Sequence, residues 1–189
     1  MTKPFDKATA IKEALRQLPQ TNTFDAQHFW PSEWTRPIKT TIAELGFQQD
    51  QSVWASGLDE KDSPDGGGCI VNQEWLFDLC WIDYHGRGPT REFRSLELAM
   101  ECELPLTKKQ RPGAVLDDFE KLIIANADLK LMVFQVDEMR EAEEQFSILQ
   151  NHAKKFVMQN QSGAYLLAGL VWKHQHQHPG FVFKEFPAA

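Results

Sequence analysis

The stretch FRSLELAMECEL at residues 93–104, followed by LDDFEKLIIA at 116–125 and LKLMVFQV at 129–136, decides the fold. The first and third segments are dense in apolar and branched residues, which is typical of buried strands. The middle segment repeats its apolar residues every three or four positions, as one face of a helix does. A helix between two strands predicts that the strands are parallel neighbours, because a tight turn cannot connect parallel strands.

A hairpin precedes this unit. Residues 75–84, WLFDLCWIDY, read as another dense strand, and HGRGP at 85–89 reads as the turn that leads into residue 93. A shorter strand is expected earlier, over residues 52–57. Together these segments predict three strands before the helix, the last two of them paired as a hairpin.

Helical spacing and turn residues define the remaining elements. A first helix is predicted over residues 6–18 and ends before Pro19; a second has Thr35 as its N-cap, Pro37 in its first turn and Gly46 at its end. Asp117 or Asp118 is the expected cap of the helix at 116–125. A long amphipathic helix is predicted over residues 137–158 and a last hairpin over 164–172 and 181–186.

The order of elements therefore predicts an α/β fold, a mixed sheet with helices on both faces. We expect one domain with three parts: an N-terminal helix and aromatic arm at 1–34, a core at 35–136, and the long helix with the last hairpin at 137–189.

Composition excludes several classes of protein. The chain has 189 residues, 42% hydrophobic, which argues against disorder, and its net charge of −7 disfavours a general polyanion binder. The start of the chain has no apolar signal core, the longest apolar run is too short to span a bilayer, and three cysteines form no disulfide framework. These features predict a soluble, cytoplasmic protein that does not associate with membranes; they do not indicate an oligomeric state.

Carboxylates stand where core residues are expected. Asp78 lies within the strand at 75–84, and Glu101 and Glu103 share one face of the strand at 93–104, opposite Leu96, Leu98, Met100 and Cys102. Pairing of the two strands would set Asp78 beside Glu101. Buried carboxylates are costly unless they are paired or bind a metal, and three of them offer the oxygen ligands that Mg²⁺ or Mn²⁺ prefers. The alternative is that the two glutamates lie at an exposed strand end.

These residues and the order of elements resemble the restriction-endonuclease-like, or PD-(D/E)xK, phosphodiesterase superfamily. The resemblance covers residues 75–136 most clearly and implies a core of helix, three-strand meander, helix and fourth strand. It implies that Asp78 and Glu101 hold Mg²⁺ or Mn²⁺ and that DNA or RNA is hydrolysed. The family usually has Lys two residues after the Glu, where this chain has Glu103; Lys121 on the following helix is the candidate for a relocated Lys, although its helical phase points away from the buried face.

Basic residues flank the carboxylates. The predicted nucleic-acid contacts are Arg87, Arg91, Arg94, Lys108, Lys109 and Arg111. Metal binding by the alternating His174, His176 and His178 is a weaker alternative. Three hypotheses follow: a metal-dependent nuclease, a non-catalytic nucleic-acid- or protein-binding member of the same fold, and an unrelated interaction protein with surface carboxylates.

Overall fold

The structure is a computed structural model that describes residues 5–21, 32–58, 70–71, 75–86, 90–104, 111–156, 162–172 and 179–188. Its elements, in chain order, are α1 Lys7–Thr21, α2 Ser32–Phe47, β1 Ser52–Ala55, β2 Ile70–Val71, β3 Leu79–His85, β4 Glu92–Glu103, α3 Arg111–Ile124, β5 Ala127–Val136, α4 Met139–Lys155, β6 Ala164–Val171 and β7 Gly180–Pro187.

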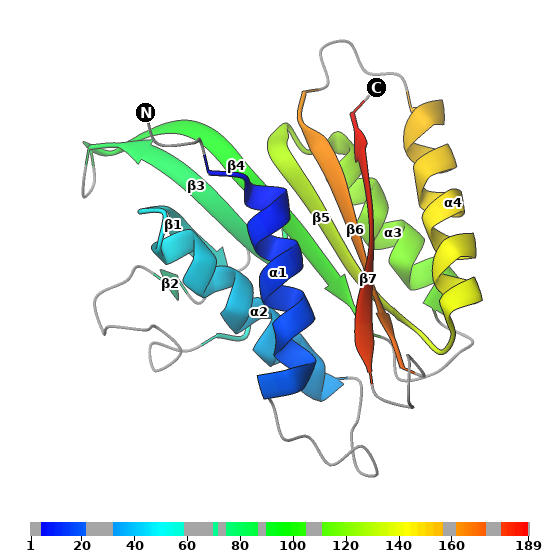
Figure 1. Cartoon of the computed structure of the whole chain (residues 1–189). Helices are drawn as coiled ribbons and strands as arrows, with labels where there is room; N and C mark the ends of the chain where they lie inside the picture. The colour runs from blue at the N-terminus through cyan, green and yellow to red at the C-terminus, as the bar shows by residue number, and fades with distance from the viewer. Residues whose placement is uncertain are drawn as a thin grey trace.

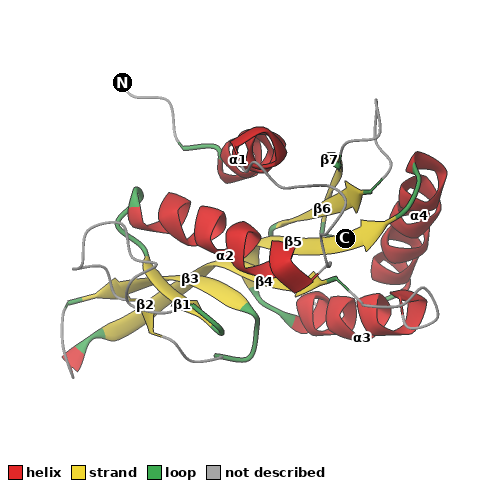
Figure 2. Cartoon of the chain, turned by 90° about the horizontal axis from the view of Figure 1, so that it is seen from below, coloured by secondary structure: helices red, strands yellow, loops and turns green. Residues whose placement is uncertain are grey.

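The strands form one mixed sheet in the order β2-β1-β3-β4-β5-β6-β7 (Figure 1). β1, β3 and β4 form an antiparallel meander, β4, β5 and β6 are parallel, and β6 and β7 form the last hairpin. Figure 2 shows α1 and α2 on one face of the sheet and α3 and α4 on the other. The α/β class and the parallel placement of β5 beside β4 are therefore confirmed; the two-residue β2 was not predicted.

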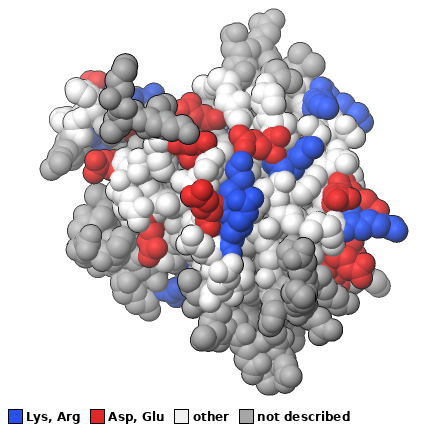
Figure 3. All heavy atoms as spheres, viewed as in Figure 1, with Lys and Arg blue, Asp and Glu red and all other residues white. Residues whose placement is uncertain are grey.

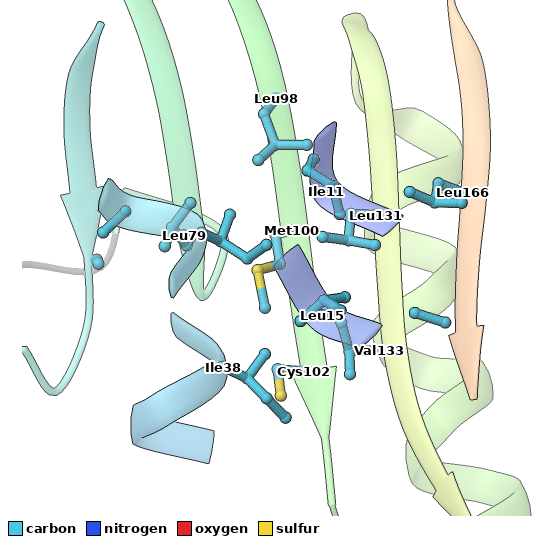
Figure 4. Close-up of a cluster of buried hydrophobic side chains, with 14 of the residues drawn as sticks. Ile11, Leu15, Ile38, Leu79, Leu98, Met100, Cys102, Leu131, Val133 and Leu166 are labelled. Carbon is cyan, nitrogen blue, oxygen red and sulfur yellow. The ribbon is translucent and has the colours of Figure 1, made fainter. Parts of the chain in front are cut away.

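A first hydrophobic core lies under α1 and α2. Their buried apolar side chains pack on Leu79, Leu98, Met100, Leu131 and Leu166 from four neighbouring strands (Figure 4). Burial of each such side chain contributes roughly 1.5–3 kcal/mol. Although α1 lies at the start of the chain, it is therefore an integral layer of the sandwich.

A second core lies between the sheet and α3 and α4. On α4, the buried residues are Ala142, Phe146, Leu149 and Ala153, spaced three or four apart as the sequence predicts. On α3, Phe119 and Leu122 are fully buried. This core extends from β3 to β7, and the carboxylates lie where β4 meets α3.

Two irregularities in β4 change which way its side chains face. Trp81 pairs with Leu98 but Ile82 pairs with Leu96, so that Glu97 is an extra residue, as in a β-bulge. A second shift follows between Asp83 and Tyr84. The prediction that Leu96 shares a face with Leu98 is wrong for this reason: Leu96 packs in the core of α3 and α4, whereas Leu98 packs under α1.

Several predicted helix ends are also wrong. α1 continues through Pro19 to Thr21, and α2 begins at Ser32, which places Thr35 and Pro37 inside it. α3 begins at Arg111, so neither Asp117 nor Asp118 is an N-cap. A proline or an aspartate marks a helix end only when nothing else stabilises the neighbouring turn, and here packing on the sheet does so.

Gly46 does not end α2 but lets it approach the sheet. A Cβ atom at this position would lie 2.6 Å from Nε1 of Trp81 and 2.8 Å from Cγ2 of Val53. The Trp81 indole is itself fixed, because its N–H donates to the carbonyl of Ile42 at 3.1 Å. The glycine is therefore required for packing.

A Gly46→Ala variant is expected to lower the free energy of unfolding by about 1–3 kcal/mol, because the added methyl overfills a rigid core. Gly113→Ala in α3 is the matched control, since nothing lies within 4 Å of its Cβ position. The control should be neutral or slightly stabilising. Urea denaturation measures both, and equal stability of the two variants would contradict the packing role of Gly46.

No helix in the described parts of the chain is long and apolar enough to cross a membrane.

Candidate functional site

Asp78 lies just before β3, which begins at Leu79 and not at residue 75 as predicted. The described pairing of β3 with β4 begins with Leu79 opposite Met100, and Asp78, one residue earlier, is close enough for its charge to act on Glu101. Oδ2 of Asp78 accepts a hydrogen bond from the backbone N–H of Cys102 at 2.9 Å. The carboxylate thus takes the place of a strand carbonyl where β3 and β4 separate.

Lys39 of α2 binds the other oxygen of the same carboxylate. Its Nζ lies 2.7 Å from Oδ1 of Asp78 and also donates to Oγ of Ser56 at 3.0 Å. The Lys39 side chain is buried, and the Asp78 side chain is three-quarters buried. Sequence reasoning missed Lys39, although its spacing from Ile42 and Ala43 places it on the buried face of α2.

Glu101 is the most buried carboxylate of the site, with 3% of the residue exposed. Burial, together with the negative charge of Asp78, raises the pKa of Glu101 to about 8, against the opposing charge of Lys121. Oε1 of Glu101 lies 3.6 Å from Nζ of Lys121, too far for a hydrogen bond. Among the described residues no donor reaches this buried oxygen.

Glu103 and Asp118 form the outer part of the site. Burial raises the pKa of Glu103, and the charge and hydrogen bond of Asp118 raise it too. Asp118 was predicted only as a helix cap. It precedes the buried Phe119 on α3, and the packing of α3 against β4 brings it into contact with Glu103.

Lys121 of α3 lies at the edge of the carboxylate group. Its Nζ is 2.8 Å from Oδ1 of Asp118, and the side chain is 47% exposed. The hydrogen bond to Asp118 raises the pKa of Lys121, with smaller contributions from Glu101 and Asp78, so the ammonium is charged at neutral pH. Its outward helical phase is as predicted, but its long side chain still reaches the edge of the carboxylate group.

The predicted basic contacts are only partly described. Arg91 is exposed and lies over the ring of Tyr84, and Arg94 lies 3.4 Å from the carboxylate of Asp83. Arg111 opens α3. The other residues of this prediction, Arg87, Lys108 and Lys109, lie outside the described residues, as do His174, His176 and His178.

The residues offer a metal ion the right chemistry but no assembled binding site. Carboxylate oxygens are the ligands that Mg²⁺ and Mn²⁺ prefer, and the buried oxygen of Glu101 lacks a donor. However, within the described ranges no three Asp, Glu, His or Cys side chains are grouped closely enough to hold a metal ion. Lys39 already neutralises Asp78. A cation at Asp78 would therefore have to displace this lysine.

Comparisons with protein-family models, curated proteins and solved structures find no match to this chain.

Proposed function

We propose that the chain is a metal-dependent phosphodiesterase of the nuclease type, acting on DNA or RNA. The observation that carries the proposal is the group formed by Asp78, just before β3, and Glu101 on β4, with Glu103 and Lys121 beside them. Such a concentration of carboxylates with raised pKa values is typical of functional sites and is costly to keep for stability alone.

The order and direction of the elements support this proposal. α2, the meander β1-β3-β4, α3 and the parallel β5 follow one another as the resemblance to the restriction-endonuclease-like superfamily implies. Asp78 comes just before β3, the second strand of the meander, and Glu101 lies near the end of β4, the third strand. Because a fold alone does not determine function, the support comes mainly from the side chains of Asp78, Glu101 and Lys121.

Each residue has a proposed role. Glu101 and Glu103, together with Asp78 once Lys39 has moved away, would hold Mg²⁺ or Mn²⁺. When bound, the metal would polarise the phosphodiester and acidify a water molecule. Lys121 would contact the phosphate and stabilise the charge that develops on it. Asp118 would position Lys121 through the 2.8 Å contact between them.

A second candidate is a non-catalytic nucleic-acid-binding protein of the same fold. The contact of Lys39 with Asp78 favours it, because an internal ammonium satisfies the carboxylate that the metal would need. Calorimetry with Mg²⁺ and with Mn²⁺ separates the two candidates, combined with cleavage assays on single- and double-stranded DNA and RNA. Metal binding with metal-dependent cleavage supports the hydrolase. Absence of both would favour the non-catalytic protein.

Lys121→Met tests the proposed lysine. We expect a loss of cleavage of at least about tenfold with little change in metal affinity, because a positioned cation stabilises the transition state more than the ground state. Lys155→Met, at the exposed end of α4, is the control and should cleave normally. If Lys121→Met cleaved as well as the control, the site would work without a relocated lysine.

A further inference from the structure

A continuous group of aromatic rings and one guanidinium lies on the sheet near β1, β3 and β4. The aromatic–arginine surface consists of Trp54, Trp75, Tyr84, Arg91 and Phe93. The Phe93 ring is stacked on Trp75 with centroids 6.0 Å apart and meets Tyr84 edge-on at 6.1 Å. The guanidinium of Arg91 lies 4.4 Å from the centroid of Tyr84 and 5.6 Å from that of Trp54.

The helices leave this surface uncovered. Trp54, Trp75 and Tyr84 pack against the core of α3 and α4, so they lie on that face of the sheet. Figure 2 shows α3 and α4 over the other half of that face, and neither helix extends over β1 and β3. As a result Phe93 is 52% exposed, and Leu76, next to Trp75, is 71% exposed.

The backbone of this region is arranged to present these side chains. The register shift between Asp83 and Tyr84 pairs Tyr84 with Phe93 and leaves Arg94 as the extra residue. Without the shift, Arg94 would stand opposite Tyr84. Leu76 has a φ of 100°, which is strained for a residue with a branched side chain. Bulges and strained residues of this kind are common next to binding sites, where they redirect side chains.

The opposite face of the sheet carries mixed charge. On the face with α1, acidic and basic side chains are interspersed (Figure 3), as in the contacts of Lys7 with Glu97 and Asp128 and of Lys12 with Glu185. That face therefore offers no broad positive patch among its described residues. On the aromatic–arginine surface, Arg91 lies directly over the rings.

We infer that the aromatic–arginine surface stacks the unpaired bases of a single-stranded nucleic acid, while Arg91 contacts its backbone or stacks on a base. The inference rests on the proposed function for the choice of a nucleic-acid partner. The exposed ring of Phe93 can accept the face of any base, and the guanidinium plane of Arg91 can do the same, while the partly buried rings beneath support them. In a duplex the base faces are already stacked on one another and cannot reach the rings.

The position of the surface fits this role. Phe93 and Glu101 lie on the same strand, β4, and both face the side of α3 and α4. Leu96 and Ala99, which lie between them on this side of β4, are buried, so a bound strand would reach the carboxylates around the edge of the core and not along the face of β4. The surface would hold the substrate without taking part in the reaction.

Binding without metal tests the inference apart from catalysis. In the presence of EDTA, the anisotropy of labelled oligothymidylate, oligouridylate and a short DNA duplex is measured with the full chain. We expect both single strands to bind at least about tenfold more tightly than the duplex, and the two single strands show whether DNA or RNA is preferred. Phe93→Ala should weaken single-strand binding about tenfold. Arg91→Ala should weaken it and reduce its dependence on salt.

Matched controls are Phe5→Ala, an exposed aromatic before α1, and Arg140→Ala, an exposed arginine on α4. Duplex binding as tight as single-strand binding would overturn the inference, as would Phe93 and Arg91 variants that bind like the controls. Metal-dependent cleavage that is unaffected by Phe93→Ala and Arg91→Ala would overturn the inference but not the proposed hydrolase. Base-dependent binding without cleavage by any metal would support the inference and overturn the hydrolase.

Discussion

Glu101→Gln is expected to stabilise the metal-free protein while it abolishes metal-dependent cleavage. Glutamine has the shape of the protonated acid, which is the form that burial and the charge of Asp78 favour in the folded state. The variant therefore avoids burying a charge. Cleavage should fall by orders of magnitude, because Glu101 is the most deeply buried of the proposed metal ligands.

The gain in stability should grow with pH. The pKa of Glu101 is about 8 when folded and near 4.5 when unfolded, so below about pH 4.5 both states are protonated and Glu101 carries no penalty. As the pH rises from about 4.5 towards 8, Glu101 loses its proton in the unfolded state before it does so in the folded state. The folded state is therefore destabilised relative to the unfolded state, by a few kcal/mol in total. Urea denaturation in EDTA from about pH 5 to about pH 9 should show wild type losing stability relative to Glu101→Gln.

Glu97→Gln provides a control of opposite sign on the same strand. Burial opposes ionisation of Glu97, but hydrogen bonds from Lys7 and Ser95 outweigh it and lower its pKa. Glu97 therefore adds stability above its unfolded pKa and loses it as the pH falls, so Glu97→Gln should destabilise the protein at neutral pH. If both variants shifted stability in the same direction, the assigned environment of Glu101 would be wrong.

Asp78→Ala is expected to cost about 3–5 kcal/mol of stability, the largest loss among the single changes considered. The substitution leaves the ammonium of Lys39 buried without its carboxylate and removes the acceptor of the Cys102 N–H. Lys39→Met should cost less, about 2–4 kcal/mol, because the Asp78 side chain is partly exposed and water can solvate it. Thermal and urea denaturation measure both.

A double-mutant cycle isolates the interaction of Lys39 with Asp78. The combined variant Lys39→Met/Asp78→Ala should be more stable than the sum of the single losses predicts, because no unpaired charge remains. Lys12→Met, which breaks the more exposed contact with Glu185, is the control and should cost less than about 1 kcal/mol. Additive losses for Lys39 and Asp78 would show that they do not interact.

This stability effect changes how activity data must be interpreted. An Asp78→Ala protein that fails to cleave could simply be unfolded, whereas an inactive Glu101→Gln protein would be more stable than wild type. Of the two substitutions, Glu101→Gln is therefore the sharper test of the proposed hydrolase.

The sheet could be predicted from the sequence because its central strands, β5 and β6, are buried on both faces. Continuous apolar runs such as LKLMVFQV in β5 read as strands without reference to any partner, and the helix between β4 and β5 required them to be parallel. The bulge at Glu97 could not be predicted, since an extra residue leaves the composition of a strand unchanged. The predicted helix ends were wrong for a similar reason, because contacts with the sheet outweighed the local signals of Pro19 and Asp117.

The candidate site, too, could be predicted from the sequence only in part. Asp78 and Glu101 could be singled out from the sequence, because a charged residue in an apolar stretch is conspicuous, and the structure places them close enough for their charges to interact. Lys39 and Asp118 were missed, because a lysine or an aspartate on a helix is ordinary until the helix is docked. Only the packing of α2 and α3 against the sheet shows that both belong to the carboxylate group.

The position of α1 has a consequence for synthesis of the chain on the ribosome. Ile11 and Leu15 are buried against Leu131 and Leu166, which are made more than a hundred residues later. At about 5–20 residues per second, the apolar face of α1 stays uncovered for on the order of ten seconds while β5 and β6 emerge. During this interval α1 is a natural target for chaperones, and docking of this helix must be among the late steps of folding.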